Sequence, residues 1–222
     1  MIRVLISDDH AMFREMLEFA LGRDPEIEVV GHAGDGRELV ERVARLHPDI
    51  ALVDYKMPLV RSFRGLIERI SGDDCDCRSI VLSGFESDDI ARAAAEGGAW
   101  GYVLKTARVD SVIAAIKAVS NGAAWVDPSL PNRIFALFQR EAEIGRGNGG
   151  TGLENLTRRE RAVLGGVADG LSNRAIARKL FISEPTVKTH LTHVFAKLNV
   201  SNRLAAALIF FGKDEPRSES AP

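Results

Sequence analysis

The chain has 222 residues, of which 45% are hydrophobic and 27% are charged, and its formal net charge at pH 7 is −2. This length allows one large or two modest domains, and this composition is typical of a globular protein. No stretch approaches the roughly 20 apolar residues of a membrane span, and the N-terminus reaches acidic residues without a signal-peptide pattern, so we expect a cytoplasmic protein without membrane contact.

The small net charge conceals a difference between the two halves. Residues 1–122 contain 15 Lys and Arg against 21 Asp and Glu, a net of −6, whereas residues 154–203 contain 9 against 4, a net of +5. Such a division suggests different partners for the two halves, with nucleic acid a candidate for the basic one. Basic helical surfaces are also common in proteins that bind no nucleic acid, so charge alone does not decide.

The first half alternates predicted strands and helices. The first helix follows from the spacing of Met12, Met16, Phe19 and Ala20. Apolar runs predict strands at 3–7, 28–33, 49–54, 79–84 and 101–105, and helical spacing predicts helices at 11–21, 36–46, 63–70, 88–98 and 109–122. Nearly continuous apolar strands joined by helices predict an α/β domain with a doubly wound parallel sheet covered on both faces.

The remainder of the chain changes character. A Pro-containing break, a predicted helix at 132–144 and a Gly-rich run indicate a linker, and helices are predicted at 157–170, 172–181, 183–198 and 201–211. Thr157 and Glu160 form a capping-box pattern at the first of these helices. We therefore expect a first domain at 1–122, a linker at 123–152, a small all-α four-helix domain at 153–213 and a disordered tail at 214–222.

Polar residues stand at the ends of four predicted strands. These residues are Asp8, Asp9, Asp54, Ser83 and Lys105. Functional groups gather at the carboxyl ends of the strands in a doubly wound sheet, so we expect these side chains to lie together. The agreement between independently assigned strands argues against the simpler explanation that each aspartate only caps a turn.

The residue types in this group suit phosphoryl transfer. Three neighbouring carboxylates raise one another's pKa values unless a cation joins them, and Mg²⁺ favours carboxylates, waters and phosphate oxygens. A lysine can hold a phosphate, a serine hydroxyl can donate to a phosphoryl oxygen, and an aspartate can itself accept a phosphoryl group. We predict that Asp54 is the phosphate acceptor and that Mg²⁺ and Lys105 compensate its charge.

The motifs SDDHAMFR, LVDYKMP, IVLSG and GYVLK closely resemble the receiver domain of bacterial response regulators. The resemblance implies a flavodoxin-like fold with strand order 2-1-3-4-5. It implies that Asp9, Asp54 and the backbone carbonyl of Lys56 ligate Mg²⁺, that Asp8 acts through water, and that Ser83 and Lys105 hold the phosphoryl group. It also places Tyr102 at an aromatic switch position, although aromatic residues are common in strands. His10 is a possible metal ligand, or it opens the first helix.

The loop after Asp54 departs from the family pattern. The family carries a glycine and then an acidic-Gly pair after the Met-Pro dipeptide, whereas this chain has LVRSFRG, with Arg61 and Arg64. This difference keeps open a regulator that works without phosphorylation. A Mg²⁺-dependent phosphohydrolase with an aspartyl nucleophile is a further alternative, but it needs a second acid two residues after Asp54, where the chain has Lys56.

The predicted helix at 183–198 has two different faces. Its apolar stripe consists of Val187, Leu191, Val194 and Leu198. The opposite face carries Lys188, Thr189 and Thr192, side chains that can enter the DNA major groove and contact base edges. The alternative is an amphipathic helix whose polar face is only solvated.

Residues 156–207 closely resemble the LuxR-type helix-turn-helix, and together with the receiver they resemble the NarL/FixJ family of response regulators. The resemblance implies a recognition helix at 184–197, a scaffold helix at 173–180, and a last helix at 204–210 that pairs two DNA-binding domains. The implied base-reading residues are Lys188, Thr189 and Thr192, and the implied phosphate contacts are Thr186, His193, Lys197 and Arg203.

These features predict a two-domain transcriptional regulator and not an enzyme. A partner sensor histidine kinase would phosphorylate Asp54, and the protein would then bind double-stranded promoter DNA as a dimer. The family resemblance further implies that the receiver covers the recognition helix in the inactive form.

Overall fold

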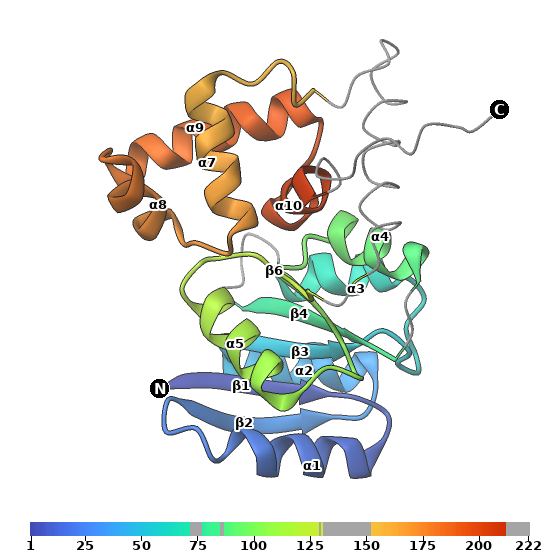
Figure 1. Cartoon of the computed structure of the whole chain (residues 1–222). Helices are drawn as coiled ribbons and strands as arrows, with labels where there is room; N and C mark the ends of the chain where they lie inside the picture. Colours follow the sequence, from blue (N-terminus) through green and yellow to red (C-terminus); the bar gives the residue numbers. More distant parts are fainter. Residues whose placement is uncertain (72–76, 85–86, 129, 131–151, 212–222) are drawn as a thin grey trace, which may run out of the picture.

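The computed structural model describes residues 1–71, 77–84, 87–128, 130 and 152–211 (Figure 1). The helix predicted at 132–144 and the tail predicted at 214–222 lie outside these described residues.

The N-terminal half contains one parallel sheet. Its strands are β1 (Ile2–Ser7), β2 (Ile27–Ala33), β3 (Ile50–Asp54), β4 (Arg78–Ser83), β5 (Gly101–Leu104) and β6 (Trp125–Val126). The order is β2-β1-β3-β4-β5-β6, and every neighbouring pair is parallel. The expected order of the first five strands is confirmed. We did not predict β6, whose two residues are too short a run to show a period, and the receiver sheet therefore extends beyond residue 122 into the expected linker.

Helices cover both faces of this sheet, as the doubly wound prediction requires. They are α1 (Ala11–Leu21), α2 (Gly36–Leu46), α3 (Phe63–Ile70), α4 (Asp88–Glu96) and α5 (Val109–Ser120). Side chains from α1 and α5 share one buried cluster with one face of the strands, and side chains from α2, α3 and α4 share another with the opposite face. Alternate residues of each strand supply the two clusters because successive side chains of a strand point to opposite faces.

Helix α1 is correctly predicted as a helix, but it packs through a different face from the one its spacing emphasised. Met12, Met16 and Phe19 are 73%, 63% and 69% exposed, whereas Leu17 and Leu21 are buried. Both sets have helical spacing, so periodicity identifies the helix without identifying its core face. The result is an apolar stripe on the outside of α1.

The C-terminal domain consists, within residues 152–211, of α7 (Arg158–Ala168), α8 (Asn173–Leu180), α9 (Glu184–Leu198) and α10 (Arg203–Phe211). The capping box that begins α7 is confirmed: Thr157 Oγ1 accepts from the Glu160 amide at 3.2 Å, and Glu160 Oε2 accepts from the Thr157 amide at 2.8 Å. The side chains of Ser172 and Ser183 cap α8 and α9 by accepting from the amides of Ala175 and Thr186. These caps satisfy amide groups that helix ends leave unpaired.

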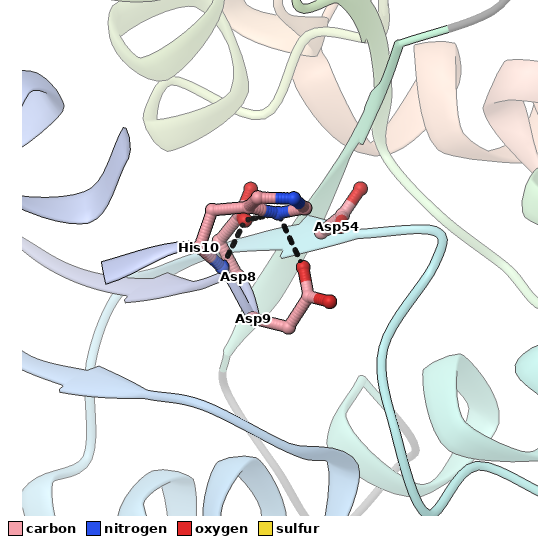
Figure 2. A group of neighbouring side chains, drawn as sticks. All are labelled: Asp8, Asp9, His10 and Asp54. Carbon is pink, nitrogen blue, oxygen red and sulfur yellow. Dashed lines mark hydrogen bonds and ion pairs between the residues drawn. The ribbon is translucent and has the colours of Figure 1, made fainter. Parts of the chain in front are cut away.

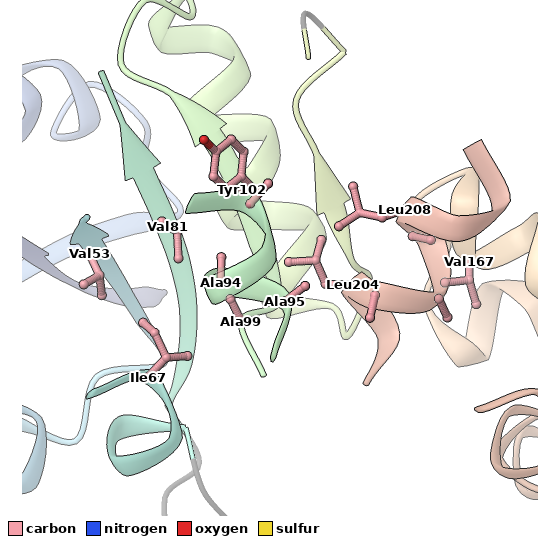
Figure 3. Close-up of a cluster of buried hydrophobic side chains, with 14 of the residues drawn as sticks. Val53, Ile67, Val81, Ala94, Ala95, Ala99, Tyr102, Val167, Leu204 and Leu208 are labelled. Carbon is pink, nitrogen blue, oxygen red and sulfur yellow. The ribbon is translucent and has the colours of Figure 1, made fainter. Parts of the chain in front are cut away.

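The two domains touch through α10, which lies beside α4 and β6 (Figure 3). Ala94, Ala95 and Ala99 of the receiver belong to the same buried cluster as Leu204 and Leu208 of α10. Residues 204–209 are all at most 7% exposed, so α10 is covered both by its own domain and by the receiver. The small alanine side chains allow α4 and α10 to approach closely.

Among the described residues, no single helix has the length and apolar character needed to cross a membrane. Helices α9 and α10 meet that criterion only when taken together, and they are bent by 64° relative to each other.

Candidate functional site

An acidic group lies at the carboxyl ends of β1 and β3 (Figure 2). Asp8, Asp9, His10 and Asp54 each offer a ligand atom, and these atoms all lie within 4.8 Å of one another. Strands β1 and β3 are direct neighbours in the sheet, with Ser7 opposite Val53, which brings the residues that follow them together. The structure thus assembles the three aspartates that the strand ends predicted.

Lys105 completes the group from the end of β5. Its Nζ lies 2.6 Å from Asp8 Oδ2 and 3.0 Å from Asp54 Oδ1. The Lys105 amide donates to the carbonyl of Ser83 at 2.7 Å, so the end of β4 is fixed beside the end of β5. Ser83 is buried, at 1% exposure. The predicted site residues of β1, β3, β4 and β5 therefore share one edge of the sheet.

Burial dominates the electrostatics of this site. It raises the pKa of Asp54, and the charge of Asp8 adds to that effect, while Lys105 and the backbone N–H of Lys56 oppose it. Burial works against the charged form of Lys105, but its bonds to Asp8 and Asp54 outweigh burial and raise the pKa of the ammonium. Three ionised carboxylates with one ammonium leave a net negative charge in a partly buried position, which favours a bound cation.

The donor atoms suit a hard divalent cation. The carboxylates supply oxygen ligands of the type that Mg²⁺ prefers, and Mg²⁺ also keeps several waters. Asp9 is exposed, with its side chain 34% accessible, so the group opens to solvent on that side. Asp8 is fully buried behind it. The arrangement fits a cation held by a few carboxylates and completed by water.

Of three further predicted residues, Lys56 and His10 lie at the group. The backbone of Lys56 is at the site because its N–H bonds to Asp54, while its side chain is exposed. Tyr102, on β5, is 1% exposed and lies in the receiver core. His10 occupies the N-cap position of α1 without a side-chain cap bond, and its Nδ1 lies 2.5 Å from Asp9 Oδ1. His10 therefore both begins α1 and lies beside the acidic group, which are the positions that its two alternative roles require.

Helix α9 presents the polar face that its sequence predicted. Its apolar stripe is buried, and Lys188, Thr189, Thr192 and His193 are exposed, with Thr186 half-buried. The hydroxyls of Thr189 and Thr192 each donate to the backbone carbonyl four residues earlier, at 3.2 Å. Their methyl groups and oxygen lone pairs remain available to a partner. The family-based expectation of a covered recognition helix does not hold for this conformation, in which the polar face of α9 is exposed and α10 packs against α4 and β6.

Lys197 has a partner within its own domain. Its Nζ lies 2.7 Å and 3.0 Å from the two carboxylate oxygens of Glu160, at the start of α7. This contact and the capping hydrogen bonds lower the pKa of Glu160 to about 2. The charge of Lys197 is therefore partly neutralised before any DNA phosphate reaches it.

Arg203 is predicted to contact a DNA phosphate, but the structure buries its side chain. It is only 6% exposed, and its guanidinium donates to Asn173 Oδ1 at 2.7 Å and to the carbonyl of Leu171. Burial lowers its pKa to about 10. Arg203 thus ties the start of α10 to the start of α8, and its burial corrects the prediction that it faces DNA. Arg203 begins α10, the helix after α9, and motif spacing alone does not show whether a side chain at that position is buried or exposed.

Asn202 was not predicted as a functional residue. Its Nδ2 donates to the carbonyl of Ala95 at the end of α4, a hydrogen bond between the two domains. The only signal in the sequence is an Asn at the start of a helix, which indicates a cap and not a partner 107 residues away.

Two domain families match the chain. Residues 4–117 match the family described as "Response regulator receiver domain", and residues 154–210 match "Bacterial regulatory proteins, luxR family". The chain belongs to the NarL/FixJ family of response regulators, which join a receiver to a LuxR-type DNA-binding domain. Both domain matches fall where the sheet and the C-terminal helices lie.

Relatives match over nearly the whole chain. The transcriptional regulatory protein DegU of Brevibacillus brevis is 36% identical over 220 residues, covering 93% of this chain and 92% of DegU. The transcriptional regulatory protein LiaR of Bacillus subtilis is 36% identical, with 94% and 96% covered. The crystal structure of the response regulator ChrA, from a heme-sensing two-component system, is 33% identical, covers 94% of this chain and 95% of ChrA, and has a TM-score of 0.51.

Proposed function

We propose that this response regulator is switched by phosphorylation of Asp54. The observation that carries the proposal is the contact of Asp54 Oδ1 with Lys105 Nζ at 3.0 Å, inside a group of three aspartates at one sheet edge. Asp9, Asp54 and the backbone carbonyl of Lys56 would hold Mg²⁺, with Asp8 acting through water. Bound there, Mg²⁺ would offset the charge that gathers between the carboxylates and a phosphoryl group.

The remaining site residues then have distinct roles. The carboxylate of Asp54 accepts the phosphoryl group, Lys105 supplies a positive charge beside it, and the hydroxyl of Ser83 donates to a phosphoryl oxygen. Tyr102 reports the change from its buried position on β5. Each of these contacts favours a receiver conformation that is rare without phosphate, so phosphorylation shifts a population.

A sensor histidine kinase is the proposed phosphodonor, and the exposed stripe of α1 is its proposed docking surface. Met12, Met16 and Phe19 expose apolar side chains on α1, the helix that follows Asp9 in the chain. An exposed apolar stripe on a helix is suited to a partner helix.

We propose that the phosphorylated protein binds double-stranded promoter DNA as a dimer. We therefore also propose that it acts in the cytoplasm, where that DNA is. Lys188, Thr189 and Thr192 would contact base edges, while Thr186, His193 and Lys197 would contact phosphates. Arg203 is left out of this set because it is buried. Helix α10 would pair two copies once the receiver releases it, so the contact between α4 and α10 holds the unphosphorylated protein in a monomeric form.

The experiment is intact-mass measurement after incubation with Mg²⁺ and a small phosphodonor, on wild type and Asp54→Asn, with size distributions of the same samples. The proposal predicts that the wild type gains one phosphoryl group and dimerises, while the variant does neither. A wild type that gains no phosphoryl group although Mg²⁺ binds would overturn the phosphorylation switch and favour a DNA-binding regulator controlled in another way. Turnover of a phosphomonoester would instead indicate a hydrolase.

A further inference from the structure

A cavity of about 600 Å³ lies on the side of the receiver formed by α2, α3 and the loop that follows Asp54. Its apolar surface comes from Val40 of α2, Leu59 and Val60 of the loop, and Leu66 of α3. Leu66 is buried, Val40 and Val60 are half-buried, and Leu59 is 74% exposed. This volume is in the range of sites that hold small organic molecules.

Three exposed arginines surround this apolar surface. Among the described residues, Arg37, Arg61 and Arg69 line the cavity together with a single carboxylate, that of Glu41. Arg37 lies 4.0 Å from Glu41, a weak contact, and Arg61 and Arg69 make no ion pair or hydrogen bond to any residue that the structure describes. By contrast, the neighbouring Arg64 pairs with Glu68 at 2.8 Å and with Glu96 at 3.6 Å. Among the described residues that line it, the cavity therefore has an excess of positive charge, three arginines against one glutamate.

Contacts within the chain hold the loop in place on α2 and so form one wall of the cavity. The Gly36 amide donates to the carbonyl of Pro58 at 3.1 Å, and a Cβ added at Gly36 would meet Val60 Cγ2 at 2.5 Å. Leu59 has a φ of 61°, a left-handed conformation that is unfavourable for leucine, and it keeps this apolar side chain in solvent. Unfavourable backbone conformations concentrate at ligand-binding sites.

We infer that this cavity binds a small amphipathic organic anion, an apolar body that carries a carboxylate, sulfonate or phosphate group. The apolar body would contact Val40, Val60 and Leu66. The anionic group would lie between Arg61 and Arg69, whose planar guanidinium groups can each form two parallel hydrogen bonds with such a group. The site is distinct from the acidic group, and its wall begins five residues after Asp54, so a ligand there contacts the loop that leads away from the phosphoacceptor.

The probe is anilinonaphthalene sulfonate, which combines an aromatic body with one anionic group, titrated by fluorescence against the full chain. Phenylnaphthylamine is the matched neutral probe. The anionic probe should bind at one saturable site, and more tightly than the neutral probe. The double variant Arg61→Gln, Arg69→Gln should weaken anionic-probe binding by about ten-fold or more, because each lost charge-assisted bond is strong. Arg64→Gln is the matched control and should bind as the wild type does.

A second variant tests the position of the site. Gly65 lines the cavity, and a Cβ added there meets only Ser62, at 3.5 Å, which is ordinary contact. Gly65→Leu should therefore fold, fill part of the cavity and abolish probe binding. The inference is overturned if all variants bind the probe as the wild type does, since the probe then binds elsewhere, such as the stripe of α1. It is also overturned if only an acidic peptide binds in an arginine-dependent way, which would assign the surface to a protein partner.

Discussion

The side-chain amide of Asn202 joins the two domains: its Nδ2 donates to the carbonyl of Ala95 in α4, while its Oδ1 accepts from the Ala205 amide at 3.0 Å. One side chain thus starts α10 and holds it to the receiver. Since α10 is the proposed dimerisation helix, this hydrogen bond opposes dimerisation. The contact offers a way to test the switch without phosphorylation.

Asn202→Asp should free α10 from the receiver. Aspartate keeps the oxygen that accepts from Ala205, but it cannot donate to Ala95 and places a negative charge beside that carbonyl. A net hydrogen bond is worth about 1 kcal/mol, so we expect about five-fold stronger dimerisation and DNA binding without a phosphodonor, measured by light scattering and DNA titration. The control is Asn121→Asp, because the side-chain hydrogen bond that the structure describes for Asn121 stays within the receiver, to Lys117. Equal behaviour of the two variants would contradict this role of Asn202.

Lys105→Met should destabilise the receiver in a way that Mg²⁺ reverses. The substitution leaves Asp8 and Asp54 buried without their cation, and loss of one partner from a buried ion pair costs about 3 kcal/mol. In chelator at pH 7 we expect the free energy of unfolding to fall by that amount, and added Mg²⁺ should reduce the difference from wild type. Lys117→Met, which removes a more exposed partner of Asp24 and Glu26, should cause a smaller loss that Mg²⁺ leaves unchanged. A Mg²⁺-independent loss for Lys105→Met would exclude these aspartates as the metal site.

Glu160 should make the stability of the C-terminal domain depend on pH. Its folded-state pKa is about 2, below the ordinary value of 4.5, so it stabilises the fold above about pH 4.5 and loses that contribution as the pH falls towards 2. Glu160→Gln should lower the free energy of unfolding by about 2 kcal/mol at pH 7, because it weakens the capping box and the contact with Lys197. In urea unfolding at several pH values, the difference from wild type should narrow below pH 4.5. A difference that stays constant with pH would show that the charge of Glu160 is not responsible.

Most of the acidic site could be predicted because topology places it. Asp8, Asp54 and Ser83 each follow or end an apolar run, and parallel strands bring such ends to one edge. The buried stripe of α9 was predictable for a similar reason, since helical period alone determines which residues share a face. Local pattern and a simple geometric rule were sufficient in both cases.

Other features depend on contacts that no local pattern contains. β6 has two residues, and only its neighbour β5 makes it a strand. The outward stripe of α1 and the burial of Arg203 depend on which surfaces pack together. The hydrogen bond from Asn202 to Ala95 depends on how the domains meet, and a backbone carbonyl carries no sequence signature. These features follow from tertiary packing, so the structure was needed to identify them.

The exposed stripe of α1 should affect phosphorylation by a kinase and not by a small phosphodonor. Met16→Asp places a charge in the centre of the stripe, 63% exposed and away from the core, so the fold should be retained. We expect phosphoryl transfer from the partner kinase to slow by about ten-fold or more, because the substitution removes an apolar anchor of the interface. Labelling by a small phosphodonor, measured by intact mass, should be unchanged. Glu15→Lys, a charge change at an exposed neighbouring position, is the control for general electrostatic effects. Equal loss with both donors would indicate damage to the acidic site and not to a docking surface.

Lys188 and Lys197 should contribute to DNA binding in different ways, although both lie on α9. Lys188 is exposed on the polar face without an ion pair among the described residues, so Lys188→Ala should weaken binding to the specific site by about 1–3 kcal/mol and reduce discrimination between sites. Lys197 is already paired with Glu160 at 2.7 Å. Lys197→Met should therefore weaken binding to all DNA sequences similarly. It should also lower the slope of log binding constant against log salt concentration by less than the value of about one expected for a full phosphate contact.

DNA titrations over a range of salt concentrations, on a selected site and on a random sequence, separate these two roles. Lys179→Ala is the matched control, because Lys179 lies on α8 and pairs with Asp169 at 2.9 Å. If Lys188→Ala weakens both DNAs equally and only the salt dependence changes, Lys188 contacts phosphate. The reading of bases would then rest on Thr189 and Thr192, whose hydroxyls already donate within the helix and can only accept hydrogen bonds from a base or contact it through their methyl groups.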